Sequence, residues 1–408
     1  MQHAVYPRVP RRGWRQIGRV GAGARGRWRR AGTEEQAGVQ DGHASGRDAA
    51  PFANGVVLLP RKPGEAPGFT ASLDRAPLKA TSGGWARELT ARQLPIATGI
   101  AVAHLFLNPG GAREMHWHNS AEWAYVMEGR AQATVADPHG TVEVFNVGPG
   151  DLWYFPRGYA HAIQTIGSDP CHAVLAFDDG LYSDHGTFGL SEVMSRINTA
   201  ALAQCFGIHP SDLTALPKGE TYIMQGEVIA ADSREAMAER LLEPIRSRRF
   251  GLLAASPAVA SAGGTIHVAS SAEFPASAAM SGLLIRLRPG AMQELHWHPD
   301  ANEMHYVVSG RVAITMFGPH KHLGVAEIAA GDCAYVPRNA GHMMQNPGPE
   351  TAEILAVQDA GVLSTATLSD WMAQAPPHLL ANNLGLMPGR KPVVRTKYPI
   401  AEAADWRP

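Results

Sequence analysis

The stretch Glu114-Met115-His116-Trp117-His118 decides the fold, because it returns later in the chain as Glu294-Leu295-His296-Trp297-His298. Matching motifs continue beyond both copies: Gly129-Arg130 with Gly310-Arg311, Gly150-Asp151 with Gly331-Asp332, and Pro156-Arg157 with Pro337-Arg338. Self-similarity at an offset of about 180 residues indicates a duplicated structural unit. The chain of 408 residues therefore divides into two related halves.

Each half consists of short apolar runs separated by tight turns. Runs of four to seven residues alternate with turn clusters such as Asn108-Pro-Gly-Gly, Asp137-Pro-His-Gly and Pro156-Arg-Gly. Closely spaced strands of this kind are typical of an antiparallel sandwich or barrel. Near the end of each half, apolar residues recur at steps of three and four. We therefore expect amphipathic helices over residues 190–207 and 368–385, each ending at a glycine.

The charge of the whole chain argues against two classes of partner. A net charge of −1 and a pI near 7.0 create no general field that would attract nucleic acid or an anionic membrane. No uninterrupted apolar stretch approaches the roughly 20 residues of a membrane-spanning helix. We expect no nucleic-acid partner and no membrane partner.

The first thirty residues carry nine arginines and no acidic residue. A secretory signal would need an apolar core of about 7 to 15 residues after these charges, and none follows. We therefore expect a cytoplasmic protein in which residues 1–67 form a basic, disordered tail. The repeat then predicts a first domain over residues 68–230 and a second over residues 231–408.

Histidines and a glutamate recur at corresponding positions in both halves. Residues two apart on a strand face the same side, so His116 and His118 project together, as do their counterparts. The recurring sets are His116, His118, Glu122 and His161 in the first half, and His296, His298, Glu303 and His342 in the second. Three imidazoles and one carboxylate suit manganese, iron, nickel, copper or zinc, and softness alone does not choose among these metals.

The order His-x-His, Glu, Gly, then Pro-Gly-Asp-x-x-Tyr-x-Pro and a last His resembles the cupin superfamily, and its duplication resembles a bicupin. The stretches Ala112-Arg-Glu-Met-His-Trp-His118, Gly150-Asp-Leu-Trp-Tyr-Phe-Pro156 and His296-Trp-His-Pro299 are similar to those of the oxalate decarboxylases. The resemblance covers about residues 84–398. It implies an all-β fold of two tandem cupin barrels, of the double-stranded β-helix or jelly-roll type, each followed by short α-helices.

The resemblance also implies an enzyme, a carboxy-lyase that converts oxalate to formate and carbon dioxide by a radical mechanism that depends on dioxygen. It implies two manganese(II) ions per chain and assigns them the ligands His116, His118, Glu122 and His161 in the first site, and His296, His298, Glu303 and His342 in the second. It further implies a homo-oligomer, either a trimer or a hexamer.

Arg113 and the segment after the first barrel are expected to bind the substrate and to supply a proton. The family uses an arginine three residues before its first histidine ligand, and a guanidinium binds a carboxylate with defined geometry. The family's flexible lid reads Ser-Glu-Asn-Ser before Thr-Phe and supplies an acid. Here the segment reads Ser183-Asp184-His185-Gly186 before Thr187-Phe188. We expect Asp184 to be the proton donor and His185 to act as a relay.

Asp184 is one methylene shorter than the family's glutamate, so the product of the reaction stays open. Without timely protonation the intermediate can be oxidised to two carbon dioxide molecules with release of hydrogen peroxide, as in an oxalate oxidase or another cupin dioxygenase. A third reading, a storage-type bicupin without activity, is disfavoured because packing alone does not require a complete ligand set in each half.

The second site departs from the family. Gln293 stands where the family has an arginine, and no lid glutamate is evident after the second barrel. His305 shares the strand parity of Glu303, so it either faces the second pocket or is hydrogen-bonded in the core. We expect catalysis at the first site and a structural or electron-storing role for the second.

Overall fold

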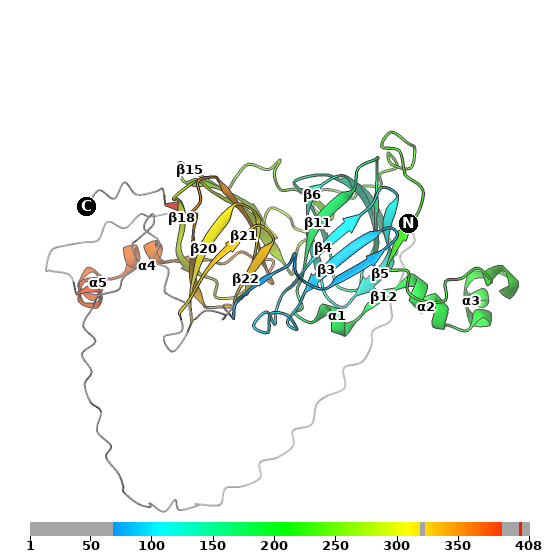
Figure 1. Cartoon of the computed structure of the whole chain (residues 1–408), viewed down its shortest axis with the longest axis horizontal. Helices are drawn as coiled ribbons and strands as arrows, with labels where there is room; N and C mark the ends of the chain where they lie inside the picture. Colours follow the sequence, from blue (N-terminus) through cyan, green and yellow to red (C-terminus); the bar gives the residue numbers. More distant parts are fainter. Residues whose placement is uncertain (1–67, 319–322, 386–399, 402–408) are drawn as a thin grey trace, which may run out of the picture. The chain divides into compact units, whose positions relative to one another are not determined.

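Two β-barrels make up most of the chain (Figure 1). The computed structural model describes residues 68–318, 323–385 and 400–401, and the predicted tail over residues 1–67 lies outside this range. Both barrels belong to one compact unit. All pairs between named strands are antiparallel, and the expected all-β fold of two tandem barrels is confirmed.

The first barrel combines a seven-stranded sheet with a six-stranded sheet. The larger sheet has the order β14 (Arg249–Gly251), β9 (Asp151–Phe155), β6 (Glu122–Glu128), β11 (Cys171–Phe177), β4 (Ala101–Leu107), β3 (Gly84–Leu89) and β2 (Leu78–Thr81). The smaller has the order β12 (Thr187–Gly189), β5 (Gly111–His118), β10 (Ala160–Thr165), β7 (Ala131–Ala136) and β8 (Val142–Val147), with β13 (Ile223–Gln225) also paired to β5.

The second barrel repeats this plan. Its seven-stranded sheet has the order β1 (Thr70–Ser72), β22 (Asp332–Val336), β19 (Glu303–Ser309), β24 (Ala352–Gln358), β17 (Ser281–Leu287), β16 (Gly264–Ala269) and β15 (Val259–Ser261). Its six-stranded sheet has the order β21 (Leu323–Ala329), β20 (Arg311–Phe317), β23 (Gly341–Gln345), β18 (Met292–Trp297) and β25 (Ala366–Thr367), with β26 (Ile400–Ala401) also paired to β18.

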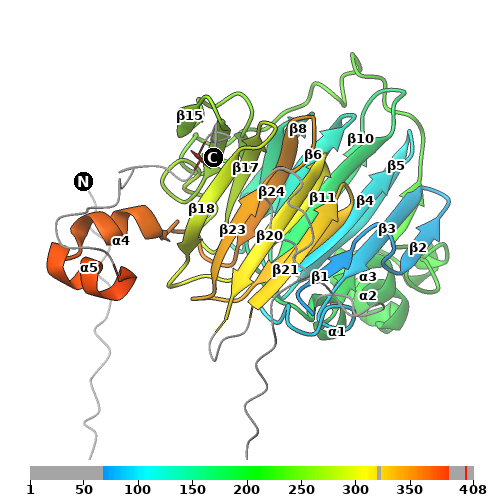
Figure 2. The same ribbon diagram turned by 60° about the vertical axis from the view of Figure 1, so that its left-hand side comes forward.

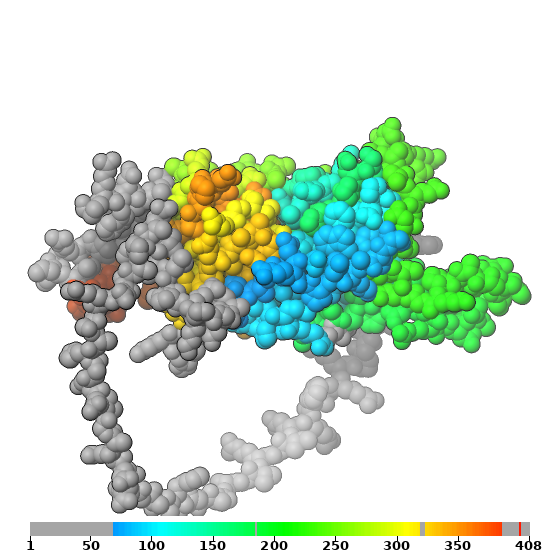
Figure 3. Space-filling view, in the orientation of Figure 1, coloured from blue at the N-terminus to red at the C-terminus, as the bar shows by residue number. Residues whose placement is uncertain are grey.

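Each barrel receives one strand from the other half of the chain. β1 precedes the first barrel but pairs with β22, whereas β14 follows the first barrel and pairs with β9. In the space-filling view, the blue residues at the start of the described chain adjoin the yellow residues of the second barrel (Figure 3). Strand pairing therefore runs across the predicted domain boundaries, which stay a prediction.

A shared apolar core joins the two barrels. Trp123 on β6 is buried and packs against Gly282 on β17, where an added Cβ would lie only 2.2 Å from the indole. The hydroxyls of Tyr154 and Tyr335 each accept a hydrogen bond from a backbone N–H of the opposite half, at 3.3 and 3.1 Å. Because these tyrosines occupy corresponding positions in the repeat, the two barrels meet through equivalent surfaces.

Each predicted helix divides into two short ones. The helices are α1 (Tyr182–His185), α2 (Leu190–Arg196), α3 (Thr199–Phe206), α4 (Leu368–Gln374), α5 (Pro377–Leu384) and the 3₁₀ helix Pro210–Leu213. Asn198 interrupts the first pair and caps α3 through its side-chain oxygen, while Pro376 precedes α5 in the second pair. Gly207 and Gly385 end the pairs with φ of 66° and 61°, in agreement with the predicted glycine caps.

The second pair of helices follows β25 at the edge of the second barrel (Figure 2). α4 contacts β18, the strand that carries His296 and Trp297 of the repeated motif. Across the described ranges, no helix combines the length and the apolar character needed to cross a membrane.

Candidate metal centres

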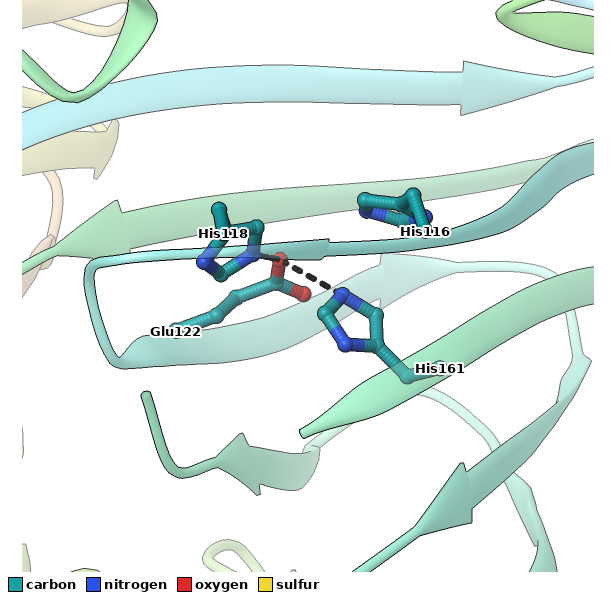
Figure 4. Close-up of side chains that lie close together, drawn as sticks. All are labelled: His116, His118, Glu122 and His161. Atoms are coloured by element: carbon teal, nitrogen blue, oxygen red, sulfur yellow. Dashed lines mark hydrogen bonds and ion pairs between the residues drawn. The ribbon is translucent and has the colours of Figure 1, made fainter. Parts of the chain in front are cut away.

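The first cluster of candidate ligands joins three strands of the first barrel (Figure 4). His116 and His118 lie on β5, Glu122 begins β6 and His161 lies on β10. The antiparallel register sets His161 opposite His116. All four residues are buried, and one ligand atom from each lies within 4.8 Å of the others. Strands of both sheets thus bring the predicted first-site ligands together.

Backbone carbonyls determine which ring nitrogen of each histidine carries a proton. The Nδ1 atoms of His116, His118 and His161 lie 2.6, 2.7 and 2.8 Å from backbone carbonyl oxygens two residues away. Because a carbonyl oxygen only accepts, each Nδ1 must donate. In the neutral ring Nε2 then keeps its lone pair, which is the arrangement found in histidines that bind metals.

The electrostatics of the cluster favour metal-binding protonation states. Burial alone would raise the pKa of Glu122, but its contacts with His118 and His161 outweigh burial and hold this pKa well below its usual range. Burial lowers the pKa of His116 and of His161. At neutral pH Glu122 therefore offers a carboxylate, and His116 and His161 offer neutral imidazoles, which are the forms that bind metal ions.

The donor atoms fit a metal ion. Oε2 of Glu122 lies 3.2 Å from Nε2 of His118 and 3.6 Å from Nε2 of His161. Lone pairs that face each other at such distances repel unless a cation lies between them. Neighbouring donors on an ion with bonds of about 2.1 Å lie about 3 Å apart. Nε2 of His161 is buried and has no hydrogen-bond partner within the described residues, which again leaves it available to an ion.

Trp153 fixes the carboxylate of this cluster. Its indole Nε1 donates a 2.7 Å hydrogen bond to Oε1 of Glu122, and both side chains are buried. The other oxygen of Glu122 thereby stays directed toward the histidines. Trp153 was not among the site residues expected from the sequence. It lies within the Gly150-Asp-Leu-Trp-Tyr-Phe-Pro156 motif, and this motif is the signal that could have identified it.

Arg113 lines the same cavity as the first cluster. This cavity measures about 40 Å³ and is also lined by His116, His118 and Glu122, so it has room for a ligand of only a few non-hydrogen atoms. Arg113 is 7% exposed, and its Nη1 donates a 2.8 Å hydrogen bond to the carbonyl oxygen of Tyr222. A buried guanidinium thus stands beside the candidate metal site, where it can attract an anion.

Two further residues of this cavity were not predicted. Tyr222 has a φ of 60°, and its ring lies under the Arg113 guanidinium at 4.2 Å from the ring centroid. Its hydroxyl donates a 3.2 Å hydrogen bond to Oε1 of Glu88, which also lines the cavity. Tyr222 contacts Arg113 partly through its backbone, for which the sequence carries no signal.

The predicted lid begins at the cavity wall. Tyr182, the first residue of α1, lines the cavity and stacks on Phe177 with ring centroids 3.8 Å apart. The hydroxyl of Ser183 donates a 2.7 Å hydrogen bond to Oε2 of Glu88. Asp184 and His185 follow as the last two residues of α1. The segment expected to hold the acid is thus continuous with the wall of the first site.

The second cluster repeats the first. His296 lies on β18, His298 follows that strand, Glu303 begins β19 and His342 lies on β23. All four are buried, and one ligand atom from each lies within 4.8 Å of the others. Oε2 of Glu303 lies 3.2 Å from Nε2 of His298 and 2.9 Å from Nε2 of His342. The predicted second-site ligands therefore form a second candidate metal centre.

The surroundings of the second cluster differ from those of the first. Gln293 occupies the position of Arg113, and its amide nitrogen lies 3.5 Å from Nε2 of His296. Nε2 of His305 lies 3.1 Å from Oε2 of Glu303, so the structure places this histidine at the second cluster. Burial would raise the pKa of Glu303, but the neighbouring histidines, His298 first, outweigh it and keep the pKa well below its usual value.

Comparison with known proteins agrees with this geometry. The family model described as Cupin matches residues 72–213 and 250–390. The oxalate decarboxylase OxdC of Bacillus subtilis is 35% identical over 321 residues, which cover 78% of this chain and 83% of that protein. A probable oxalate decarboxylase of Arthroderma benhamiae is 33% identical over 322 residues, which cover 78% of this chain and 79% of the relative.

A solved structure shows the same architecture. The structure of oxalate decarboxylase from Bacillus subtilis at pH 4.6 matches with a TM-score of 0.77 and 32% identity, covering 84% of this chain and 89% of the other. The family model accounts for both halves of the chain, and each half contains one cluster of three histidines and a glutamate. The chain therefore belongs to the cupin family, as a bicupin related to the oxalate decarboxylases.

Proposed function

We propose that this chain is a manganese-dependent oxalate decarboxylase that converts oxalate to formate and carbon dioxide at its first metal centre, with dioxygen as a co-catalyst. The observation that carries this proposal is the buried guanidinium of Arg113 in the small cavity that the first cluster lines. The activity named in the similar proteins supports the choice of reaction.

Oxalate would be bound by charge and by geometry together. Arg113 is the cation that faces one carboxylate of the dianion, and its contacts with Tyr222 hold the plane of the guanidinium. Burial strengthens the attraction, because a cavity sheltered from water has a lower effective dielectric constant than the solvent. The small size of the cavity favours a two-carbon dicarboxylate over longer ones.

The ligands of the first centre are His116, His118, Glu122 and His161. A bound manganese(II) ion would hold oxalate through its open coordination positions and, with dioxygen, would supply one-electron chemistry. In the net reaction one C–C bond breaks, one C–H bond forms and one proton is consumed. Electrons balance without an external reductant, so the chain itself has to deliver only a proton.

We assign this proton to Asp184, with His185 as its relay. Both residues belong to α1, which starts at Tyr182 in the cavity wall. An acid on a short, separately anchored segment can approach the substrate while the buried walls exclude bulk water. Ser183, whose hydroxyl is bonded to Glu88, would hold the start of this segment against the barrel.

Product analysis tests the proposal. Purified protein loaded with manganese(II) and supplied with oxalate and dioxygen should form formate and carbon dioxide in nearly equal amounts, with little hydrogen peroxide. Two carbon dioxide molecules and one hydrogen peroxide per oxalate would assign the chain to the oxalate oxidases instead. A fully loaded protein that leaves oxalate unchanged would favour the storage-type alternative.

A further inference from the structure

The two candidate metal centres share the same four donors, three histidines and a glutamate, but have different walls. In the first barrel, β6 and β9 place Ala124 opposite Trp153, whose indole holds Glu122. In the second barrel, the corresponding strands β19 and β22 place His305 opposite Ala334. A small and a large residue have thus exchanged strands between the halves. The space filled by an indole in the first centre is available to an imidazole in the second.

The position of Phe177 in the first barrel is also changed in the second. Phe177 pairs with Glu122, whereas Gln358 pairs with Glu303. The side-chain nitrogen of Gln358 donates a 3.0 Å hydrogen bond to Oε1 of Glu303 and so takes over the role of the Trp153 indole. The second carboxylate is therefore oriented without a tryptophan, and His305 is not needed for that purpose.

His305 is buried without satisfying its own polar atoms. The residue is 0% exposed, and neither of its ring nitrogens has a hydrogen-bond partner within the described residues. Its Nε2 lies 3.1 Å from the same oxygen of Glu303 that lies 3.2 Å from His298 and 2.9 Å from His342. A buried ring nitrogen without a hydrogen bond is costly, and an ion shared with these neighbours would satisfy Nε2, the nitrogen that faces Glu303.

We propose that His305 binds the second ion as a fourth imidazole, beside His296, His298, Glu303 and His342. The three distances to Oε2 of Glu303 match the separation of about 3 Å expected between neighbouring donors on one ion. The ligand atoms of the other four residues all lie within 4.8 Å of one another, and His305 is outside this set, so its ring has to move toward the other histidines when the ion binds. Five protein donors leave one position in an octahedral shell, whereas a dicarboxylate that chelates needs two. The second centre then holds an ion and at most one small ligand such as water.

Nitrogen-rich coordination also changes which ion is preferred. Imidazole favours nickel, copper and zinc, whereas a larger share of oxygen donors suits manganese. Gln293 in place of an arginine removes the cation that would attract a dianion to this centre. The second centre therefore selects a later first-row divalent ion more strongly than the first. This inference rests on metal binding at both clusters, as in the proposed function, but not on oxalate turnover.

Pulsed electron paramagnetic resonance on manganese(II)-loaded protein tests the coordination directly. A full-length chain with His116→Ala and His118→Ala retains only the second centre, and it should show four coupled imidazole nitrogens. Adding His305→Ala should reduce the number to three. A chain with His296→Ala and His298→Ala retains only the first centre and should show three. Three nitrogens in the second-centre chain before His305 is changed would overturn the proposal.

Competition between nickel(II) and manganese(II) tests the selectivity. The second-centre chain should prefer nickel over manganese at least about tenfold more strongly than the first-centre chain does, and His305→Gln should remove most of this difference. His267→Ala, which alters another buried histidine of the second half, is the matched control and should leave the ratio unchanged. Equal ratios in the two single-centre chains would refute the inference.

These measurements separate the inference from the proposed function. A chain that decarboxylates oxalate while its second centre shows three nitrogens refutes only the role of His305. A second-centre chain that binds neither manganese nor nickel refutes the inference and also the two-ion part of the proposed function. Binding of nickel and manganese is measured as metal per chain after gel filtration, so neither result depends on activity.

Discussion

The guanidinium of Arg113 lies over the ring of Tyr222 and donates a hydrogen bond to the carbonyl oxygen of the same residue. The ring of Tyr222 is held in turn, because its hydroxyl donates to Glu88. Arg113 therefore has a defined plane beside the first metal centre. A lysine at this position would keep the charge but would have no plane to orient.

We predict that Arg113→Lys lowers kcat/KM for oxalate by about 10- to 100-fold, because misorientation of a bound substrate costs rate on this scale. Metal content should stay at the parental level, since Arg113 is not one of the four donors. Arg311→Lys, which changes an exposed arginine of the second barrel, is the control. An unaltered rate in Arg113→Lys would show that the guanidinium does not orient the substrate.

Trp153→Phe should weaken the first metal centre. The substitution keeps an aromatic ring in the core but removes the N–H that holds Oε1 of Glu122. Loss of such a supporting hydrogen bond typically lowers metal affinity about 10- to 100-fold. Titration with a metal chelator should therefore empty the first centre earlier than in the parent. Trp85→Phe removes an indole that stacks on Phe106, and this control should leave the affinity unchanged.

The two centres should differ in what their loss does. His116→Ala with His118→Ala removes two of four donors and should abolish oxalate turnover. His296→Ala with His298→Ala should empty the second centre and lower the melting temperature, because an ion bound only by the folded state stabilises that state. Metal analysis and thermal unfolding with and without chelator measure both effects. Full activity in the His116→Ala, His118→Ala variant with an empty first centre would show that oxalate is not converted at the first centre.

The predictable part of the site is the part with a local and repeated signal. His116 and His118 are two residues apart on one strand, and the same spacing returns at His296 and His298. Alternation along a strand is enough to place such side chains on one face. The helix ends at Gly207 and Gly385 were equally readable.

The contacts that could not be predicted join distant segments. Tyr222 contacts Arg113 although 109 residues separate them in the sequence. Part of this contact uses a backbone oxygen, which every residue has, so the sequence cannot indicate it. The exchange of β1 and β14 between the barrels likewise has no local pattern, because any short edge strand can pair with any free edge. The sequence also could not predict whether His305 faces the second pocket, because this depends on the size of the residue opposite it, which is Ala334.

A histidine pair outside the two ligand clusters, His104 and His172, should make the fold sensitive to acid. Burial, first, and the neighbouring His172 lower the pKa of His104 to about 4, although contact with Asp74 opposes this. The unfolded chain has a higher histidine pKa and so binds a proton first as the pH falls. The stability contributed by neutral His104 is complete above about pH 6.5 and is lost progressively down to about pH 4.

His104→Gln should therefore flatten the pH dependence of stability. Between pH 7 and pH 4.5 the parent should lose more free energy of unfolding than the variant, by an amount on the order of 2 kcal/mol. Urea unfolding at both pH values measures this difference. His139→Gln changes an exposed histidine in the turn between β7 and β8 and should behave like the parent. Equal losses in the parent and His104→Gln would contradict the assignment.

The last prediction concerns the proton donor. Asp184→Asn removes a titratable carboxyl from α1 and should collapse formate production, with hydrogen peroxide becoming the larger product. Asp184→Glu lengthens the acid by one methylene and should hold or raise the ratio of formate to peroxide. His185→Ala should lower this ratio if the imidazole relays the proton, and should leave it unchanged if His185 is a bystander.

Product ratios on oxalate, measured for the three variants beside the parent at equal metal content, decide this prediction. Ratios are more informative than rates here, because a partly misfolded variant loses both products together, whereas a lost proton donor redirects one into the other. Ser195→Ala on α2 is the matched control, since its exposed hydroxyl donates only to the carbonyl oxygen of Glu192 and the change removes no acid. An Asp184→Asn protein that forms formate at the parental rate would exclude Asp184 as the acid.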